Sequence, residues 1–400
     1  MNKPRPRILI YVPEVDQTWG GIRQYTCTLI ALLSKLKTYE FFIFHNSNDP
    51  EILRVSENIE NISLINKNSV STSLSNRMTI RFKNFVLKVI NKIFKLKVPL
   101  IEINHLQEIV QALNIVIVHT PYQFLPDVEN TKRVTTIHDV QELYYPEFFT
   151  PNQRAYRARE YSKATKQSSH IVVSYNHVKN DLMRFFQVPA EMIDVILLQM
   201  DNHWVCKMTQ NNLIDLKQYN LPEKYLLYPA NAWSHKNHDA IIEAVNNATQ
   251  QGVKIHVVFT GNFNNAQGEL LKKKIIDYAL EKQIVIMGIV DENTLYSLYC
   301  SCAGVVVPTL YEAGSFPLME AILLGIPVIC SNVTSLPETI GNDDFIFDAN
   351  DINDVCSKMI SLYSDETYRQ HSKANAISRR DSIIHTLADE KFARIYQSLL

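Results

Sequence analysis

The stretch that decides the fold runs from residue 308 to residue 332 and reads PTLYEAGSFPLMEAILLGIPVICSN. It follows the apolar run AGVVV at 303–307 and closes on a second apolar run, PVIC at 327–330. Between these runs, Pro317 suits the first turn of a helix, whereas Gly325 and Pro327 are residues that end one. The pattern therefore predicts a strand, a loop, a helix and a second strand, the repeating unit of a parallel α/β sheet.

Similar units fill most of the chain, because apolar runs of strand length alternate with helical patterns. The runs are continuous and do not alternate with polar residues, which indicates strands covered on both faces. The predicted strands are RILIYVP (7–13), FFIFH (41–45), NIVIVHT (114–120), RVTTIHD (133–139), HIVVSY (170–175), KYLLYPA (224–230), KIHVVFTG (254–261), QIVIMG (283–288), AGVVVPT (303–309) and PVICSN (327–332). A chain of 400 residues is too long for one ordinary core, so we predict two doubly wound, Rossmann-like α/β domains.

The two sets of units are separated by the weakly periodic segment 195–225. We predict an N-terminal domain at 1–205, a second domain at 206–382, and a C-terminal helix within 383–400 that packs back on the first domain. Ligands of doubly wound sheets bind outside the carboxyl ends of the strands. The residues that directly follow each predicted strand are therefore the candidates for a functional site.

Composition narrows the class of protein. The chain is 46% apolar and 20% charged with a net charge of -1, which fits a globular protein and argues against nucleic acid as a partner. Its six cysteines show neither a CxxC pair nor zinc-like spacing, which indicates reduced thiols and a cytoplasmic location. There is no Asp-x-Asp motif, and the sequence predicts neither a metal nor a cofactor.

One basic segment departs from this balance of charge. Residues 61–101 contain eight Lys and Arg residues and neither Asp nor Glu. Within residues 77–98, an apolar helical face lies opposite a row of lysines that includes Lys88 and Lys92. Such a helix can lie on the anionic inner face of a cell membrane, which would make the protein peripheral there. The other interpretation is a helix that packs on its own sheet and exposes its basic face to solvent.

Two carboxylates flank the start of the predicted helix. Glu312 and Glu320 are eight positions apart, and the pattern puts Glu312 on the loop and Glu320 in the first helical turn. The N–H groups around Ser315, Phe316 and Leu318 have no helical partner there, so they can bind a phosphate. Carboxylates accept hydrogen bonds from hydroxyls, such as those of a ribose or a sugar ring. The combination favours a nucleotide sugar as ligand, and a helix-capping glutamate beside a surface acid is the alternative.

The spacing from Glu312 to Glu320, followed by EAILLGIPVICSNVTSLPETIG (320–341), resembles the retaining glycosyltransferases of family 4, which have the GT-B fold. This group, glycosyl transferases group 1, includes bacterial mannosyl- and rhamnosyltransferases. The upstream stretch IMGIVDENTLYSLYCSC (286–302) is similar to the family's usual lead-in. The resemblance implies two Rossmann-like domains that face a cleft. It also implies that Glu312 contacts the hydroxyls of the donor sugar and that Glu320 contacts the ribose.

Further candidates follow from the same resemblance, which is strong over residues 225–355 and thinner over 7–200. Lys236 falls where the family has a lysine on the diphosphate, whereas Asn231 and His235 stand in the places of its usual arginine. His138 falls at the position of the family's site histidine. The candidate residues are His138, Glu312 and Lys236 for catalysis; Glu320, Ser315, Phe316, Gly314, Leu318, Gly261, Asn262, Ile289 and Asn231 for donor binding; and Gly20 and Gly21 for the acceptor and phosphate loop.

The resemblance implies a metal-independent hexosyltransferase that retains anomeric configuration. Its donor would be a nucleotide-diphosphate sugar, with a mild preference for GDP-mannose. Its acceptor would be a glycan or polyprenyl-linked glycan in bacterial lipopolysaccharide or exopolysaccharide synthesis. The alternatives are a non-catalytic GT-B scaffold in a polysaccharide assembly complex, a GT-B sugar-nucleotide epimerase or phosphorylase, and a dehydrogenase, which would need dinucleotide-binding glycines that are missing. The sequence leaves the donor, the acceptor and the linkage open.

Overall fold

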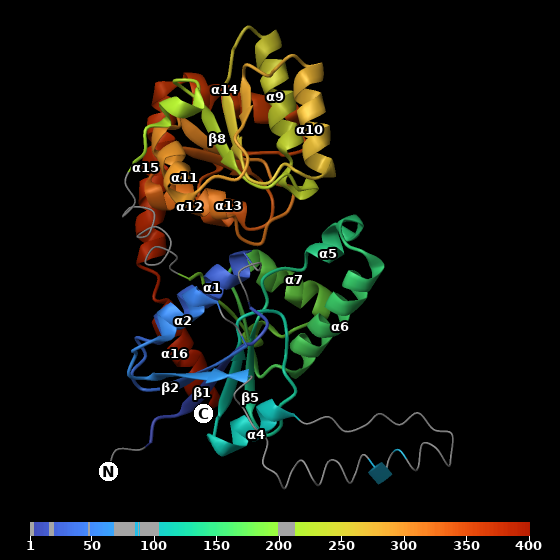
Figure 1. Cartoon of the computed structure of the whole chain (residues 1–400), viewed down its shortest axis with the longest axis vertical. Coiled ribbons are helices and arrows are strands. Elements are labelled where there is room, and N and C mark those ends of the chain that lie inside the picture. Colours follow the sequence, from blue (N-terminus) through green and yellow to red (C-terminus); the bar gives the residue numbers. More distant parts are fainter. Residues whose placement is uncertain are drawn as a thin grey trace.

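The computed structural model describes residues 4–15, 20–46, 49–67, 85, 86, 88, 104–198 and 213–400. Within this part of the chain the strands form two sheets, and neighbouring strands in both are parallel. Helices connect most successive strands and cover the sheets, whereas β4 (Ile117–Thr120) and β5 (Lys132–Thr136) are joined without a helix (Figure 1). The predicted α/β class with two doubly wound sheets is therefore confirmed.

Both sheets contain a point where the strand order reverses. The first sheet has the order β3-β2-β1-β4-β5-β6-β7 and reverses between β1 and β4, and the second has the order β10-β9-β8-β11-β12-β13 and reverses between β8 and β11. The strands are β1 (Arg7–Val12), β2 (Glu40–His45), β3 (Ile62–Asn66), β4 (Ile117–Thr120), β5 (Lys132–Thr136), β6 (His170–Val173), β7 (Ile193–Val195), β8 (Leu226–Pro229), β9 (Val257–Thr260), β10 (Ile284–Ile286), β11 (Gly304–Val307), β12 (Val328–Ser331) and β13 (Ile346–Phe347). Ligands of such sheets bind at the reversal point.

The helices alternate with these strands, as the sequence predicted. Helices of the first part are α1 (Gly20–Leu33), α2 (Pro50–Ser56), α4 (His105–Ala112), α5 (Gln141–Tyr144), α6 (Pro151–Gln167) and α7 (Asn176–Phe186). Helices of the second part are α9 (His238–Gln250), α10 (Ala266–Asp277), α11 (Glu292–Ser301), α12 (Phe316–Leu324), α13 (Leu336–Ile340), α14 (Ile352–Ser364) and α15 (Glu366–Ile384). In Figure 1, α12 and α13 lie on the side of the second sheet that faces the first, close to α1 and α7.

The last helix, α16 (Ala388–Leu399), leaves the second sheet and packs on the first. Its apolar side chains, among them Phe392 and Tyr396, share one buried cluster with Ile8 and Ile10 of β1. We call the first sheet with its helices the first body, and the second sheet with its helices the second body. Figure 1 shows this red helix beside the blue strands of the first body, although it comes from the other end of the chain. The chain therefore passes between the two bodies once in each direction.

Two predictions fall on residues outside the described part. These are the domain boundary at residue 205 and, apart from residues 85, 86 and 88, the basic segment 77–98. The domain limits and the membrane contact accordingly stay predictions. None of the described helices combines the length and the apolar character that a membrane span requires.

Candidate active site

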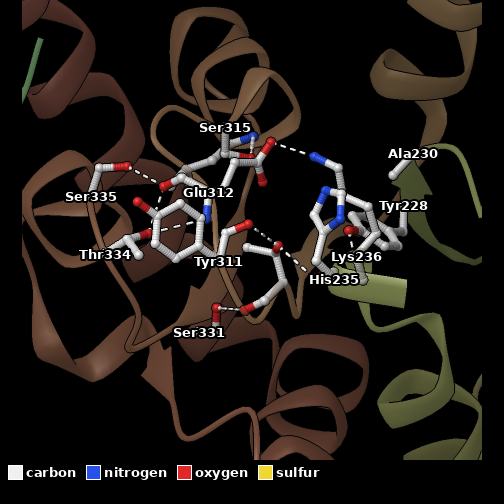
Figure 2. Close-up of polar contacts among 12 residues, drawn as sticks. Tyr228, Ala230, His235, Lys236, Tyr311, Glu312, Ser315, Ser331, Thr334 and Ser335 are labelled. Atoms are coloured by element: carbon white, nitrogen blue, oxygen red, sulfur yellow. Dashed lines mark hydrogen bonds and ion pairs between the residues drawn. The ribbon is translucent and has the colours of Figure 1, made fainter. Parts of the chain in front are cut away.

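The reversal point of the second sheet brings two predicted site residues together. Lys236 ends a short 3-10 helix (Ser234–Lys236) that follows β8, and Glu312 lies on the loop that follows β11. Because β8 and β11 are neighbours, these two loops leave the sheet side by side. Lys236 Nζ donates a hydrogen bond to Glu312 Oε1 at 2.5 Å (Figure 2).

The ion pair lies in a cavity of about 400 Å³ that both bodies line. From the first body come residues that follow β1 and β5, namely Gly21, Ile22, Tyr25, His138, Asp139 and Gln141, together with Ser174, Tyr175, Leu197 and Leu198. From the second come Trp233, His235, Lys236, Tyr311, Glu312, Ala313, Gly314, Ser315, Phe316 and Met319. Seven of the predicted site residues therefore line one cavity: Gly21 and six others. These six are His138, Lys236, Glu312, Gly314, Ser315 and Phe316.

Only one of the two oxygens of the Glu312 carboxylate has a hydrogen-bond partner in the described part of the chain. Its side chain is 11% exposed, and Lys236 takes up only the Oε1 oxygen. The other oxygen, Oε2, is buried and has no hydrogen-bond partner among the described residues. Buried polar atoms are almost always hydrogen-bonded in native proteins. The cavity therefore presents an acceptor that a ligand donor, such as a hydroxyl, can satisfy.

Lys236 is held by contacts to its backbone. Tyr228, which is fully buried in β8, donates its hydroxyl hydrogen bond to the Lys236 carbonyl at 2.9 Å. The next residue, Asn237, adopts the left-handed conformation at φ 55°. Its side-chain amide donates to the carbonyls of Pro308 and Ala349 at 3.1 and 3.4 Å. These contacts tie the Lys236 loop to the end of β11, where Glu312 begins its own loop.

Helix α12 corrects one part of the sequence interpretation. It begins at Phe316, and the Ser315 hydroxyl caps it by accepting from the Leu318 N–H at 3.4 Å. The Leu318 N–H is therefore partly used, contrary to the prediction of a free donor. Glu320 is the fifth helical residue, so its placement in the first turn was wrong. The predicted end is correct, because Gly325 adopts the left-handed conformation at φ 68°.

Glu320 lies behind this helix start and does not line the cavity. Its side chain is 6% exposed, and the Tyr299 hydroxyl donates to its Oε2 at 2.6 Å. Tyr299 belongs to α11 and is fully buried. A ligand that reaches Glu320 must therefore approach a carboxylate that is already oriented by a buried tyrosine.

His138 faces the ion pair from the first body, at the carboxyl end of β5. Its Nε2–H donates to the Pro121 carbonyl at 2.9 Å, and its ring makes a T-shaped contact with the Tyr25 ring, with 4.7 Å between ring centroids. Burial lowers the pKa of His138 below its usual value. A neutral ring that donates through Nε2 keeps Nδ1 as a hydrogen-bond acceptor. His138 can therefore accept a hydrogen bond from a substrate hydroxyl.

Three of the remaining predicted residues line a second cavity of about 380 Å³, formed by the loops after β9 and β10. Gly261, Asn262 and Ile289 line it, and Ile289 is 78% exposed. Gly261 has φ 113°, and a Cβ there would lie 2.6 Å from the Ala230 carbonyl oxygen, so this turn requires glycine. Asn231 lines neither cavity. Its Oδ1 accepts from the Asn262 N–H at 2.7 Å, so Asn231 holds the loop after β9 that lines the second cavity.

The sequence interpretation missed two residues that hold the backbone of Glu312. Thr334 and Ser335 follow β12 and hydrogen-bond the Glu312 backbone. Their position after a strand was the available signal, because the same criterion had selected Lys236 and Glu312. As for metals, the described part of the chain contains no group of three or more His, Cys, Asp or Glu side chains that could hold a metal ion.

Known families match both halves of the chain. Residues 19–197 match the model described as Glycosyltransferase Family 4, and residues 212–379 match the model described as Glycosyl transferases group 1. O-antigen chain mannosyltransferase B of Escherichia coli is 24% identical over 66% of this chain and 69% of its own length. Serotype-specific mannosyltransferase WbdA of Escherichia coli is 26% identical over 67% of this chain. The match spans only 34% of WbdA.

Solved glycosyltransferases share the overall arrangement. A glycosyltransferase from Rickettsia africae ESF-5 has a TM-score of 0.64 at 17% identity, with 99% of each chain covered. Sucrose-phosphate synthase from Thermosynechococcus elongatus has a TM-score of 0.68 at 16% identity, with 99% of each chain covered. Anabaena Alr3699/HepE, solved with UDP and glucose, has a TM-score of 0.66 at 13% identity and covers 98% of this chain. At these identities the likeness establishes the GT-B fold. With both halves matched by its domain models, the chain belongs to the family 4 glycosyltransferases of the GT-B fold.

Proposed function

We propose that this protein transfers a hexose from a nucleotide-diphosphate sugar to a glycan or polyprenyl-linked acceptor of a bacterial surface polysaccharide, with retention of anomeric configuration. The observation that carries the proposal is the Lys236–Glu312 pair at the reversal point, with the Glu312 Oε2 left unsatisfied in the cavity. GDP-mannose is the preferred donor because the relatives named above are mannosyltransferases. The domain models support transferase chemistry over a purely structural role.

The donor fits this cavity with its diphosphate near Lys236 and the start of α12. The ammonium group neutralises charge that grows on the diphosphate as the glycosidic bond breaks, and the helix dipole adds to this effect. Glu312 Oε2 accepts from a hydroxyl of the transferred sugar, which holds the sugar ring in place. Both interactions come from the second body, so this body carries most of the donor.

The acceptor fits the opposite wall, where His138 lies. A neutral His138 accepts a hydrogen bond from a hydroxyl through Nδ1 and orients it toward the sugar. The new glycosidic bond forms as the bond to the diphosphate breaks, and the hydroxyl proton leaves with the diphosphate. Because the cavity lies between the two bodies, their closure excludes water that would otherwise hydrolyse the donor. We propose that no metal is needed, since the cation and the helix start take that role.

The proposal is tested first by a thermal-shift titration with GDP, UDP, dTDP and ADP, each with and without Mg²⁺. One nucleotide should raise the melting temperature, and the rise should saturate with concentration. At 100 times its Kd, the nucleotide should stabilise the folded protein by about 2.7 kcal/mol. The effect should be the same without Mg²⁺. Stabilisation by none of the four at millimolar concentration would instead favour the non-catalytic scaffold.

The same protein then tests the role of Glu312. Glu312→Ala should abolish transfer from the matching sugar nucleotide while the nucleoside diphosphate still stabilises the variant. The variant lacks the carboxylate that accepts the sugar hydroxyl, so the sugar is no longer held in place for transfer. Normal turnover by Glu312→Ala would remove this residue from the site.

A further inference from the structure

Thr334 has a backbone conformation that its side chain disfavours. It lies between β12 and α13, and its φ is 52°. Glycine and asparagine adopt this left-handed conformation readily, whereas a β-branched residue there is an outlier. Strained backbone of this kind persists only where the surrounding contacts enforce it, and it concentrates at functional sites. A specific contact should therefore account for a threonine at this position.

That contact is a clamp on the backbone of Glu312. The Thr334 hydroxyl donates to the Glu312 carbonyl at 2.6 Å and accepts from the Glu312 N–H at 3.3 Å (Figure 2). Ser335 occupies the N-cap position of α13, yet its hydroxyl does not cap that helix. It donates to the same Glu312 carbonyl at 3.0 Å. Two adjacent hydroxyls thus fix the peptide groups on both sides of one carboxylate residue.

The helix that follows the clamp makes contact with the other body. Glu338 of α13 accepts from the backbone N–H of Asn176 at 3.0 Å and from its side-chain amide at 2.8 Å. Asn176 is the first residue of α7, and the N-cap residue Tyr175 provides no side-chain cap. Glu338 therefore supplies the missing cap of a helix in the first body. The five residues of α13 thus connect the Glu312 clamp at one end to the opposite wall of the cavity.

Tyr175 strengthens the same connection. Its ring lies against the Glu312 loop so closely that a Cβ on Gly314 would be 3.2 Å from the Tyr175 Cε2 atom. Burial raises the pKa of Tyr175 to about 12, although the nearby Thr339 side chain of α13 acts to lower it. The start of α7 therefore contacts both the Glu312 loop and the helix that clamps this loop.

We propose that Thr334 and α13 form a positioning device that sets Glu312 in place when the two bodies close on each other. The proposal rests on the proposed function, in which Glu312 contacts the donor sugar. Glu338 contacts the start of α7 when the bodies are closed, which fixes the position of α13. Thr334, just before α13, then holds the Glu312 backbone through its hydrogen bonds. Thr334 is accordingly a positioning residue, and the reaction depends on its hydroxyl and not on its shape.

The test compares variants that separate hydroxyl, shape and closure. Thr334→Val keeps the branched shape and loses the clamp, Thr334→Ser keeps the hydroxyl, and Ser335→Ala removes the second bond. Glu338→Ala removes the contact to α7. Thr165→Val is the control, because Thr165 is a buried threonine of α6 whose hydroxyl bonds its own helix at the Tyr161 carbonyl. GDP-mannose, UDP-glucose and dTDP-rhamnose are offered singly, and release of the nucleoside diphosphate is measured alongside its binding to each variant.

Thr334→Val and Ser335→Ala should lower kcat by roughly 10–100-fold, as expected for a catalytic group displaced by about 1 Å. Nucleoside diphosphate affinity should change less than about twofold, and Thr334→Ser and Thr165→Val should retain wild-type turnover. Glu338→Ala should also lower kcat. Combining it with Thr334→Val should cost less than the product of the two single losses, because both act on one element.

Three outcomes would overturn the proposal. The first is wild-type kcat in both clamp variants while Glu312→Ala is inactive. The second is loss of nucleotide affinity in step with kcat, which indicates a general structural role. The third is fully multiplicative losses in the double variant, which rejects the link to closure. If Thr334→Val fails to fold, Ser335→Ala decides the same question. Wild-type turnover in Glu312→Ala would instead contradict the proposed function itself.

Discussion

At the scale of residues, the site depends on an ion pair that has two tasks. In the free protein Lys236 and Glu312 neutralise each other, with side chains only 12% and 11% exposed. In the proposed function, a nucleotide sugar brings a partner for each of them, a diphosphate for the lysine and a hydroxyl for the carboxylate. The pair therefore keeps two charged groups available in a cavity where either alone would be costly to bury.

This arrangement predicts an asymmetric response to substitution. Lys236→Met leaves a buried carboxylate without its cation and should destabilise the protein by about 3 kcal/mol. The double variant Lys236→Met with Glu312→Gln should recover most of that loss, because no uncompensated charge remains. Urea unfolding measures both. Lys272→Met is the control, since it removes an exposed pair with Glu269 and should change stability by less than about 1 kcal/mol. An equal loss in the single and double variants would contradict the argument.

The sequence predicted the site residues that belong to one local pattern. Glu312, Gly314 and Ser315 follow a strand and precede a helix, so their place could be read from chain order. Thr334 also follows a strand, but that position did not show which residue it holds, and Tyr299, inside α11, could not be found in this way. Their importance comes from the partner that each contacts, and those partners are 22 and 21 positions away. Glu320 was misplaced because the first helical residue is Phe316 and not Pro317.

At the scale of elements, the sequence predicted the central strands and one edge strand, β10, and missed the other three edge strands. Every continuous apolar run became a strand, because central strands of a parallel sheet are buried on both faces. The three strands that were missed, β3, β7 and β13, all lie at the edge of a sheet. In β3 the residues Ser63 and Leu64 are exposed, so the apolar run that identifies a central strand is absent. The contact between α1 and α12 across the cavity was also beyond prediction.

That contact limits how the two bodies can approach each other. A Cβ on Gly21 of α1 would lie 2.7 Å from the Phe316 Cε2 atom at the start of α12. Gly21→Ala should therefore hold the bodies apart and lower kcat/KM roughly tenfold, an effect typical of small misplacements in a site. Alanine favours helix over glycine, so the variant should fold at least as well as the wild type.

The matching experiment reduces the partner. Adding Phe316→Leu to Gly21→Ala should restore part of the lost kcat/KM, because the smaller side chain makes room for the new methyl group. Steady-state kinetics and a melting curve are measured for both variants. Unchanged kinetics in Gly21→Ala would show that this contact has no part in closure.

At the scale of the whole molecule, the chain end ties the two bodies together. Helix α16 completes the core of the first body after α15 has packed on α12 and α13 of the second. A buried hydrogen bond lies where α16 packs on the first sheet. His119 of β4 is fully buried, and its Nδ1 shares a hydrogen bond of 2.7 Å with the Tyr396 hydroxyl of α16. The first body therefore cannot complete its core without the last helix of the chain.

The burial of His119 predicts how the stability of the protein depends on pH. Burial lowers the pKa of His119 from its usual 6.5 to about 3. The unfolded chain therefore binds one more proton than the native protein between these two values. Stability is fully present above pH 6.5 and falls as the pH drops toward 3. The expected slope from one such histidine is about 1.4 kcal/mol per pH unit.

Substitution of His119 isolates its contribution from those of other histidines with lowered pKa, such as His235 and His238. His119→Asn should be less stable than the wild type at pH 7, because it loses the bond to Tyr396 and part of the core packing. Its stability should nevertheless fall less steeply between pH 6.5 and 4, by about one proton in slope. Urea unfolding at half-unit pH steps measures this slope. His371→Asn, at an exposed position of α15, should keep the wild-type slope. If His119→Asn also kept it, His119 would not be the group whose protonation loosens the last helix.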